Sequence, residues 1–561
     1  MEATFKIPEL RSQIAQNLTK SDLKICMLVC QGWAQDFRPY LWHKVVLNQQ
    51  LAYTMTKDLF QKYAYLIRTL VISDPMPLLN DWFLPRVCSN LVEISIEPRL
   101  SPKRRLVSAM YRSSRHTDQS IDFMSLASVD KIFDLIIDCS PTLQKVEEQW
   151  FTLSQAHTNL FAEWLCRQRT GLSEISTCHW KLSSFDQLYS LLEMNSRLRT
   201  LSLLHISIDL TNSNDNNNNS ADGGNGKGGG GGGDGGGNSE MTLDFGKLWN
   251  LSLSAVKLKE PEGSVPLKIQ VQARELVSLT FTGLQDTFPS PSNPLSLARK
   301  ISSWYCPNLK ELNLTHDDND ANHSVMMLFA SANRLETLSI TDSIIHPTEA
   351  IQLLLQRHAN TLKSIDLSGT IGLASSDLQS ILTSCPNLID FTGSGDKLWY
   401  TRLIQQPWVC RQLQSLVIFI HLPLKVTLQN GNHDSEAGGS IHTRNNEMKY
   451  TKEQLEMYKG VYDQLAPLTQ LKSIRLGGFC RGGKHFIGIP WNLAAGLDRL
   501  RGLSKIESIY FTGNLSEIGT EEAWWFKKHW PRLKTIQRIN SYIEVLDTQI
   551  SDILGPGVRV Y

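Results

Sequence analysis

The side chains that could do chemistry lie scattered along the chain. The acidic run HDDNDANH, residues 316–323, has carboxylates suited to calcium. With Asp318 as the first ligand, however, His323 takes the glycine position and Phe329 that of the bidentate glutamate. The 14 histidines show no HxxxH spacing and the 10 cysteines show no CxxC spacing. The sequence therefore predicts a polar loop at 316–323, no metal or cofactor, and a protein that is not an enzyme.

One glycine-rich stretch invites comparison with a phosphate-binding loop. The letters GNGKGG lie within residues 212–239, where Gly228 occupies the place of the required Ser or Thr. Apart from Ala221 the segment has no apolar residue, so it cannot bury enough surface to offset its ordering entropy. We therefore expect 212–239 to be a disordered Asn/Gly-rich insertion, not a nucleotide site.

Composition limits the kinds of partner. Lys and Arg total 56 against 55 Asp and Glu, a net charge of +1 that gives no global attraction to nucleic acid or to an anionic membrane. No run of about 18 apolar residues occurs, and charged residues interrupt the N-terminus, so neither a membrane span nor a secretory signal is expected. The cysteines are too sparse for a disulfide framework. We expect a cytoplasmic and/or nuclear protein that binds other proteins.

An LxxLxL pattern recurs along most of the chain. Its most regular starts fall 25 to 27 residues apart, at Leu309, Leu335, Leu362, Leu388 and Leu413. This step lies in the leucine-rich-repeat range, and stacking such units buries the apolar face that one unit alone exposes. Each match predicts a strand with its leucines inward, while intervening segments such as 375–387 have helical spacing. The sequence thus predicts an α/β leucine-rich-repeat solenoid over residues 60–545, with a curved parallel sheet and helices on the convex side.

Four cysteines fit this repeat. Each stands two to four residues before a predicted strand segment: Cys88, Cys139, Cys306 and Cys385. Because they recur one to a repeat and do not cluster, we interpret them as small buried residues where a helix leads into a strand. Roughly fourteen or fifteen units are expected in all.

Where two LxxLxL segments lie further apart than usual, we expect an insertion between them. The outward positions of the strands are expected to form a binding face. Besides 212–239, we expect a polar insertion at 421–460, and residues 546–561 as a C-terminal tail. Outward positions are mostly small and neutral-polar, which suits hydrogen bonding more than charge steering. The positions that we expect to face a substrate protein are Glu311, Asn313, Thr337, Ser339, Asp366 and Arg475.

The opening stretch, residues 7–42, has a different character. Apolar residues recur every three or four positions from Ile7 to Leu18, which indicates a first amphipathic helix. Thr19 with Asp22 predicts the start of a second helix that is apolar nearly all round, and Pro39 is expected to end a third element. Three short helices cannot enclose so many large apolar residues. Their excess surface must contact either the first solenoid turns, as a cap, or a partner protein.

The order of residues in this stretch resembles an F-box. It has a Pro-Glu-Leu start at Pro8, the pair Asp22-Leu23, the pair Val29-Cys30 ahead of Trp33, and a closing Leu41-Trp42. Here Glu9 follows Pro8 directly, whereas the usual start is Leu-Pro-x-Glu. Followed by these repeats, the chain resembles the F-box and leucine-rich-repeat proteins that fungi carry in large numbers, with a small all-α F-box of three helices at 5–47.

The resemblance implies a substrate-recognition subunit of an SCF-type cullin E3 ubiquitin ligase. In that family the F-box binds a Skp-family adaptor, and through it a cullin and a RING subunit, while the repeats bind the substrate protein. It assigns to the adaptor surface Pro8, Leu10, Ile14, Leu18, Leu28, Leu41 and Trp42. It assigns to the F-box core Leu23, Val29, Cys30 and Trp33.

Two alternatives stay open. One is a leucine-rich-repeat interaction or scaffold protein without ligase function, whose N-terminal helices only cap the solenoid. The other is an enzyme whose active residues come together from distant positions.

Overall fold

The structure is a computed structural model in which the chain forms two compact units, residues 1–306 and 307–561. It describes residues 8–48, 56–73, 88–96, 142–148, 171–182 without 179, 184–209 without 205, 240–259 without 255, 268–282, 301–315, 321–341, 348–393 without 371, 398–399, 404–421, 451–477, 489–512, 518–539 and 544–560. The insertion predicted at 212–239 lies outside these residues, as do Cys139 and most of the loop predicted at 316–323.

Three helices begin the first unit: α1 (Pro8–Asn17), α2 (Lys20–Met27) and α3 (Gln31–His43). The predicted start of α2 is confirmed. The Thr19 hydroxyl accepts a hydrogen bond from the Asp22 amide at 3.2 Å, and the Asp22 carboxylate accepts one from the Thr19 amide at 3.1 Å. This reciprocal capping satisfies amides that have no partner within the helix. Helix α3 packs against both others, and an ion pair between Arg11 and Asp36 also joins it to α1.

The prediction that an element ends at Pro39 is wrong. Pro39 lies inside α3, which continues to His43. Proline lacks an amide hydrogen and so removes one hydrogen bond of the helix. On either side of it Phe37 and Leu41 pack into the same apolar cluster, and this packing holds the helix in one piece.

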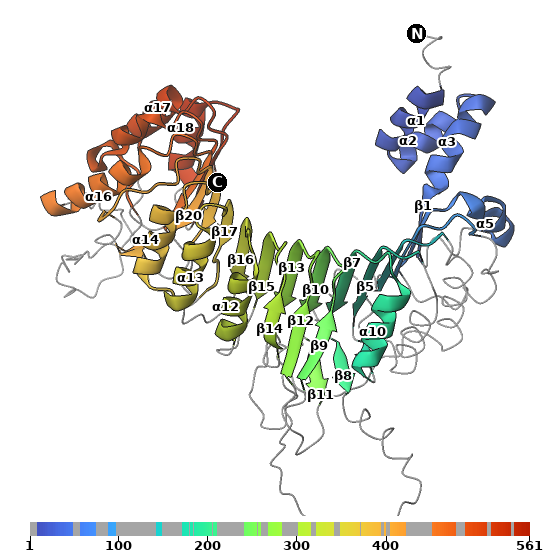
Figure 1. Ribbon diagram of the computed structural model, residues 1–561. Coiled ribbons are helices and arrows are strands. Elements are labelled where there is room, and N and C mark those ends of the chain that lie inside the picture. The colour runs from blue at the N-terminus through green and yellow to red at the C-terminus, as the bar shows by residue number, and fades with distance from the viewer. Residues whose placement is uncertain are drawn as a thin grey trace, which may run out of the picture. The chain divides into compact units, whose positions relative to one another are not determined.

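The main sheet of the first unit is wholly parallel, and its strands follow in chain order (Figure 1). The strands are β1 (Lys44–Leu47), β2 (Thr69–Ile72), β3 (Glu93–Ile96), β4 (Lys145–Glu148), β5 (Glu174–Cys178), β7 (Thr200–Leu204), β10 (Asn250–Ser254) and β13 (Ser278–Thr282). Their register aligns one buried apolar residue from each strand, for example Ile175 with Leu201 and Leu201 with Leu251.

The chain returns from strand to strand through a second set of elements. The helical ones are α5 (Lys57–Tyr63), η2 (Ala64–Leu66) and α10 (Phe185–Met194). The others are strands of two small parallel sheets, β6 (Lys181–Leu182) with β8 (Ser207–Asp209) and β11 (Lys257–Lys259), and β9 (Glu240–Asp244) with β12 (Lys268–Gln272) and β14 (Ile301–Tyr305). In β12, Ile269 and Val271 alternate with polar residues and are buried. That period of two favours a strand where other repeats have a helix.

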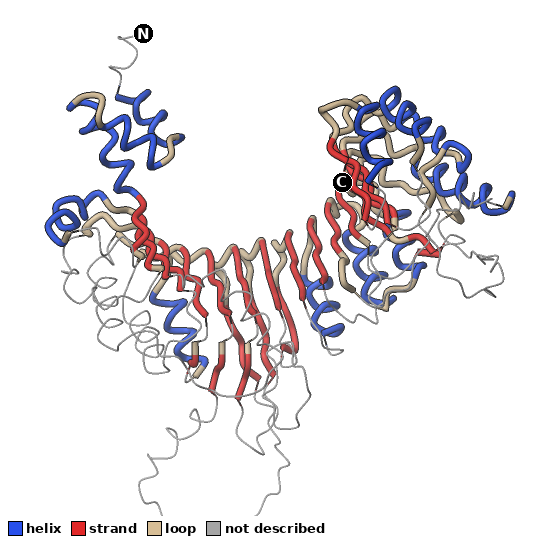
Figure 2. Tube along the Cα trace, turned by 180° about the vertical axis from the view of Figure 1, so that it is seen from behind, coloured by secondary structure: helices blue, strands red, loops and turns tan. Residues whose placement is uncertain are grey.

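The second unit has a parallel sheet with helices along one side (Figures 1 and 2). Its strands are β15 (Glu311–Thr315), β16 (Thr337–Thr341), β17 (Ser364–Asp366), β18 (Asp390–Thr392), β20 (Ser415–Ile418), β22 (Ser473–Leu476), β23 (Ser508–Thr512), β24 (Thr535–Ile539) and β25 (Arg559–Val560), with a separate pair β19 (Leu398–Trp399) and β21 (Ile420–His421). Its helices are α12 (Ala321–Ser331), α13 (Thr348–His358), α14 (Ser375–Ser384), α16 (Lys452–Leu465), η3 (Leu493–Ala495), η4 (Leu497–Gly502), α17 (Thr520–His529) and α18 (Glu544–Leu554).

The predicted fold class is confirmed: the chain is an α/β leucine-rich-repeat solenoid preceded by three helices. Two of the predicted boundaries differ from the structure. Residues 452–460 of the expected insertion begin α16, which buries Tyr458, Val461, Tyr462 and Leu465 at helical spacing. The expected tail at 546–561 is a last repeat, because α18 leads to β25, which pairs with β24. Its strand of two residues is too short to show the LxxLxL pattern.

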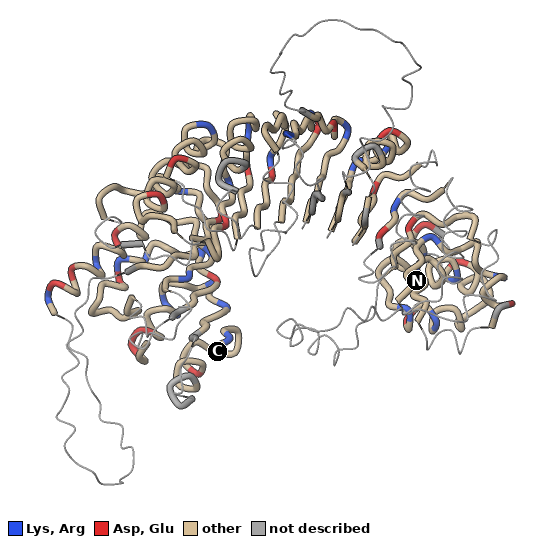
Figure 3. Tube along the Cα trace, turned by 90° about the horizontal axis from the view of Figure 1, so that it is seen from below, with Lys and Arg blue, Asp and Glu red and all other residues tan. Residues whose placement is uncertain are grey.

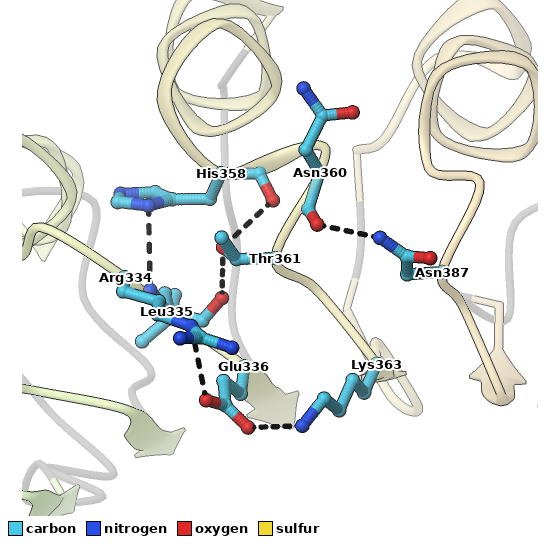
Figure 4. Close-up of polar contacts among 8 residues, drawn as sticks. All are labelled: Arg334, Leu335, Glu336, His358, Asn360, Thr361, Lys363 and Asn387. Carbon is cyan, nitrogen blue, oxygen red and sulfur yellow. Dashed lines mark hydrogen bonds and ion pairs between the residues drawn. The ribbon is translucent and has the colours of Figure 1, made fainter.

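Neighbouring repeats are also joined by side chains at the entry to each strand (Figure 4). The Thr361 hydroxyl donates to the Leu335 carbonyl of the preceding repeat at 2.6 Å. The Asn387 amide group donates to the Asn360 carbonyl at 2.7 Å, one repeat further on. Lys363 and Glu336 form an exposed ion pair at 2.6 Å, which contributes less than about 1 kcal/mol because water screens it.

His358 is the buried polar link in this group (Figure 4). Its Nδ1 accepts a hydrogen bond from the Leu335 amide at 3.5 Å, so the proton sits on Nε2, which donates to the Phe329 carbonyl at 2.9 Å. Burial lowers the pKa of His358 below its ordinary value of 6.5, although the bond to Phe329 opposes the shift. A second ring proton would face the Leu335 N–H, so the folded chain favours the neutral form.

We expect His358 to make stability depend on pH in one direction. The folded-state pKa lies below the unfolded value, so the contribution is complete above 6.5 and is lost as pH falls through the folded-state pKa. The variant His358→Gln can make both hydrogen bonds but does not titrate. Urea unfolding, followed by circular dichroism at about pH 7.5 and about pH 5.5, should show a smaller pH effect in this variant than in the wild type.

The exposed His43, at the end of α3, supplies the matched control. The variant His43→Gln removes an exposed imidazole, and the pH effect in His358→Gln is compared with the effect measured in it. Equal pH dependence in His358→Gln and the wild type would contradict the assignment of this effect to His358.

Candidate functional site

The three N-terminal helices, here called the helical module (residues 8–43), have an apolar core of their own. Ala15, Leu23 and Phe37 are buried, with exposed fractions of 4% or less. Six partly buried side chains surround them: Leu18, Cys26, Met27, Trp33, Tyr40 and Leu41. The rings of Trp33 and Phe37 lie 5.3 Å apart between centroids. The helical module therefore holds its helices together by contacts within itself.

The helical module is joined to the first repeat mainly through α3. This helix leads directly into β1, with Lys44 at its C-cap. The ring of Trp42 lies 5.0 Å from that of Tyr63, over which Arg38 also stands at 5.3 Å. From α2, Lys20 donates to the Lys44 carbonyl at 2.6 Å. Partial burial lowers the pKa of Lys20, and the charges of Lys44 and Lys24 lower it further.

Three apolar side chains at the end of α2 are left in solvent. Ile25 is 64% exposed, Leu28 86% and Val29 60%. They belong to a closed turn, because the Leu28 amide donates to the Ile25 carbonyl at 3.0 Å and the Val29 amide to the Cys26 carbonyl at 3.2 Å. The backbone thus holds them in place before any partner arrives, which lowers the entropic cost of binding. We call Ile25, Leu28 and Val29 the apolar turn.

The predicted adaptor residues differ in exposure. Leu28 and Ile14 are exposed, and Leu10 is half-buried on α1. Leu18 and Leu41 pack against the core of the helical module, while Trp42 is half-buried beside Tyr63. Pro8 begins α1, and its side chain lies outside the described residues. A pattern of spacing marks all seven as apolar, but it does not say which of them the other helices cover.

Two of the four predicted core residues are corrected. Leu23 is buried, and Trp33 packs against the core. Val29 and Cys30 are exposed, because both lie in the connection between α2 and α3. Cys30 caps α3 instead, with its sulfur accepting from the Trp33 amide at 3.5 Å.

Sequence reasoning assigned no role to three residues that have a part in the helical module. Ile25 is one side of the apolar turn, and Ala15 and Phe37 complete the core. Phe37 follows Trp33 by four residues, a spacing that places two side chains on one helix face. That signal could have assigned Phe37 to the core, whereas Ala15 is too small to stand out among larger apolar residues.

The predicted substrate-facing residues lie on the outward face of the second sheet. Glu311 and Asn313 of β15 pair in register with Thr337 and Ser339 of β16, and Ser339 pairs with Asp366 of β17. The structure thus brings five of the six together. Arg475 lies apart from them on β22, beyond β18 and β20.

Other chemistry is sparse in the part of the chain that the structure describes. No three His, Cys, Asp or Glu side chains there lie close enough together to hold a metal ion, and no helix there is long and apolar enough to cross a membrane. Positive and negative residues are interspersed in both units (Figure 3). Cys88, Cys306 and Cys385 are buried, as predicted. Burial raises the pKa of Cys385 to about 12 and that of Cys410 to about 11, so neither is poised as a nucleophile.

Comparisons with known proteins give distant likenesses only. No family model and no curated protein matches the chain. Among solved structures, the complex of Rad7 and Elc1 from yeast is similar at 10% identity and a TM-score of 0.30, over 91% of this chain and 86% of that one. A second similar structure is the leucine-rich-repeat ectodomain of the plant receptor kinase GASSHO1/SCHENGEN3 from Arabidopsis thaliana, in complex with CASPARIAN STRIP INTEGRITY FACTOR 2. Its identity is 10% and its TM-score 0.21, over 87% of this chain and 60% of that one.

Neither likeness is close enough to indicate function. The fold and the site themselves define the class: a leucine-rich-repeat solenoid with a helical module that presents an apolar turn.

Truncation of two leucines, Leu23 in α2 and Leu28 at its C-cap, should change stability by very different amounts. Leu23→Ala leaves a cavity in the core of the helical module and should destabilise it by about 2–5 kcal/mol. Leu28→Ala removes a side chain that is already in water and should change stability by less than about 0.5 kcal/mol. Hydrogen exchange of α1–α3, measured with strand β22 as an internal reference, checks both. Equal loss of protection in the two variants would refute the division between core and apolar turn.

The cysteines should differ in how fast they react, according to their exposure to solvent. Cys30 is exposed, whereas Cys385 and Cys410 are buried with pKa values raised to about 12 and about 11. Treatment of the native protein with iodoacetamide, followed by mass spectrometry, should modify Cys30 well before the other two, which should react after denaturation. Early modification of Cys385 would show that its repeat opens readily in the native protein.

Proposed function

We propose that this chain is the substrate-recognition subunit of an SCF-type cullin E3 ubiquitin ligase. The helical module docks on a Skp-family adaptor, which connects it to a cullin and a RING subunit, and the repeats bind the substrate protein. One observation carries the proposal: the helical module leaves Ile25, Leu28 and Val29 in solvent although it has a core of its own. The F-box-like order of residues in the same stretch supports it.

The apolar turn has the properties of an interface anchor. Protein interfaces obtain most of their affinity from a few apolar or aromatic residues that become fully buried. Leu28 has nearly all of its surface to lose on binding, and Ile25 and Val29 flank it on a turn fixed by backbone hydrogen bonds. At about 25 cal/mol per Å² of apolar surface, burying such side chains is favourable enough to anchor a partner.

The contacts with the first repeat argue against a simple cap. A cap would cover the end of the solenoid with its most apolar surface. In the described residues the first repeat is instead contacted by the C-terminal half of α3, through Arg38 and Trp42, and by Lys20. The apolar turn takes no part in these contacts and remains exposed.

Adaptor binding tests the proposal. The full chain should bind a purified Skp-family adaptor, and the double variant Leu28→Ala/Val29→Ala should lose about 2 kcal/mol or more, roughly thirtyfold in Kd. Isothermal titration calorimetry measures the loss. The matched control is Leu59→Ala, on α5 of the first repeat, where the leucine is 42% exposed; it should bind as the wild type does.

Two results would contradict the proposal. One is no binding of the adaptor by the intact chain. The other is equal loss in the control variant, which would assign the effect to general surface change. Leu41→Ala/Trp42→Ala is a less direct test, because Leu41 packs into the core and Trp42 contacts Tyr63, so that pair should also unfold the helical module.

A further inference from the structure

Four neighbouring strands of the second unit present an almost uncharged outward face. Their register, β20 to β22 to β23 to β24, aligns two outward rows. The first row is Ser415, Ser473, Ser508 and Thr535. The second row is Val417, Arg475, Tyr510 and Gln537. Arg475 is therefore the one charged residue in these two rows.

Among the described residues, Arg475 lacks the ion-pair and hydrogen-bond partners that an arginine side chain usually has. It alternates with buried Ile474 and Leu476, so it points away from the core and is half-buried on the outward face. Its Nε is buried and has no hydrogen-bond partner among the described residues, and no ion pair of Arg475 is found among them. A guanidinium does not lose its charge in proteins, so a buried donor without an acceptor lowers stability until a partner supplies one.

Other positive side chains of the chain contrast with Arg475. On the outward face of the first unit, Lys145 lies 3.1 to 3.6 Å from three carboxylates, Glu93, Glu147 and Glu174. At the strand entries of the second unit, Lys363 pairs with Glu336 and Lys534 pairs with Glu507. Arg475, by contrast, has no carboxylate paired with it among the residues that the structure describes.

Three of the outward neighbours of Arg475 have side chains that can donate or accept hydrogen bonds. Tyr510 pairs with it on β23, and paired strands lie about 4.8 Å apart across a sheet. Ser473 lies two residues before Arg475 on β22, and Ser508 pairs with Ser473 on β23. One guanidinium, one phenol and two hydroxyls thus lie on the same face of two neighbouring strands. Val417 on β20 closes the other side with an apolar surface.

We propose that Arg475, with Tyr510, Ser473 and Ser508, binds the carboxylate of an aspartate or glutamate side chain in an extended segment of a partner protein. The planar guanidinium matches the two oxygens of a carboxylate, and its single positive charge neutralises a single negative one. On the β20 side the next charged outward residues are acidic, Asp390 on β18 and Asp366 on β17. On the other side the first row continues from Thr535 to Arg559 on β25, so Arg475 is the single positive charge between them and matches a group with one negative charge. The surrounding hydroxyls suit the backbone of an extended segment.

This inference rests on the proposed function in one respect: the proposed function makes the partner protein a substrate of the ligase. The repeats could bind such a segment in a protein of any function. Adaptor binding by the helical module and anion binding at Arg475 can therefore fail separately, and each has its own measurement.

A charge-swap selection tests the site. Nine-residue peptides of random sequence, displayed on phage, are selected on the purified full chain and on Arg475→Glu. The wild type should enrich an acidic residue at one peptide position, and Arg475→Glu should enrich lysine or arginine there. A synthetic peptide of the wild-type consensus should bind Arg475→Glu and Arg475→Ala at least about tenfold more weakly, and Arg475→Lys should keep part of the affinity.

Arg334→Glu is the matched control. Arg334 is an exposed arginine of the same unit, near Glu336 at 3.3 Å, and its reversal should leave the selected peptide bound as tightly as before. Each variant should also bind the adaptor as the wild type does. The proposal is overturned by selection without an acidic position, by equal binding to wild type and Arg475→Ala, or by tighter binding of a peptide with phosphoserine in place of the acidic residue.

Discussion

The structure depends on one constraint, which is that every repeat must bury its apolar strand residues against those of its neighbours. In the second unit Leu312, Leu338, Ile365 and Phe391 stand in one buried column because their strands pair in parallel and in register. A backbone carbonyl at each strand entry, such as that of Glu336, accepts amides of the next repeat at 2.8 and 3.1 Å. A shift of one residue would turn the column outward. The same register therefore fixes the inner column and the outward rows.

This constraint explains which parts of the fold could be predicted. A step of 25 to 27 residues is visible in one sequence because the same inward positions must be apolar in every repeat. The strands that follow Leu309, Leu335 and Leu362 are confirmed for this reason. The elements opposite the sheet obey a weaker constraint, since a helix or a short strand can cover the same column. Alternating Ile269 and Val271 therefore form β12 where a helix was the general expectation, and β25 is too short to show any period.

The helical module could be predicted less well. Which of its side chains are buried depends on how three helices pack together, and this packing does not recur along the chain as the repeats do. Leu23 and Leu28 are the same residue type five positions apart, yet one is buried in the core and the other is 86% exposed. Spacing identifies an apolar helix but not the side that its neighbours leave open. The same holds for Val29 and Cys30, which a sequence pattern assigns to the core and a tight turn carries into solvent. The excess of apolar residues was visible in the sequence, whereas its location was not.

The outward rows of the sheet differ from the buried strand residues and from the core of the helical module in what constrains their residue types. A position that faces solvent adds little to the stability of the solenoid, so its residue can change without loss of fold. Serine and threonine meet that condition at almost any outward position, as in β20 to β24. Arg475 does not meet it fully, because its buried Nε lacks an acceptor within the described residues and lowers stability as a result. A residue that the fold does not need, and that weakens it slightly, is the kind that binding to another molecule can explain.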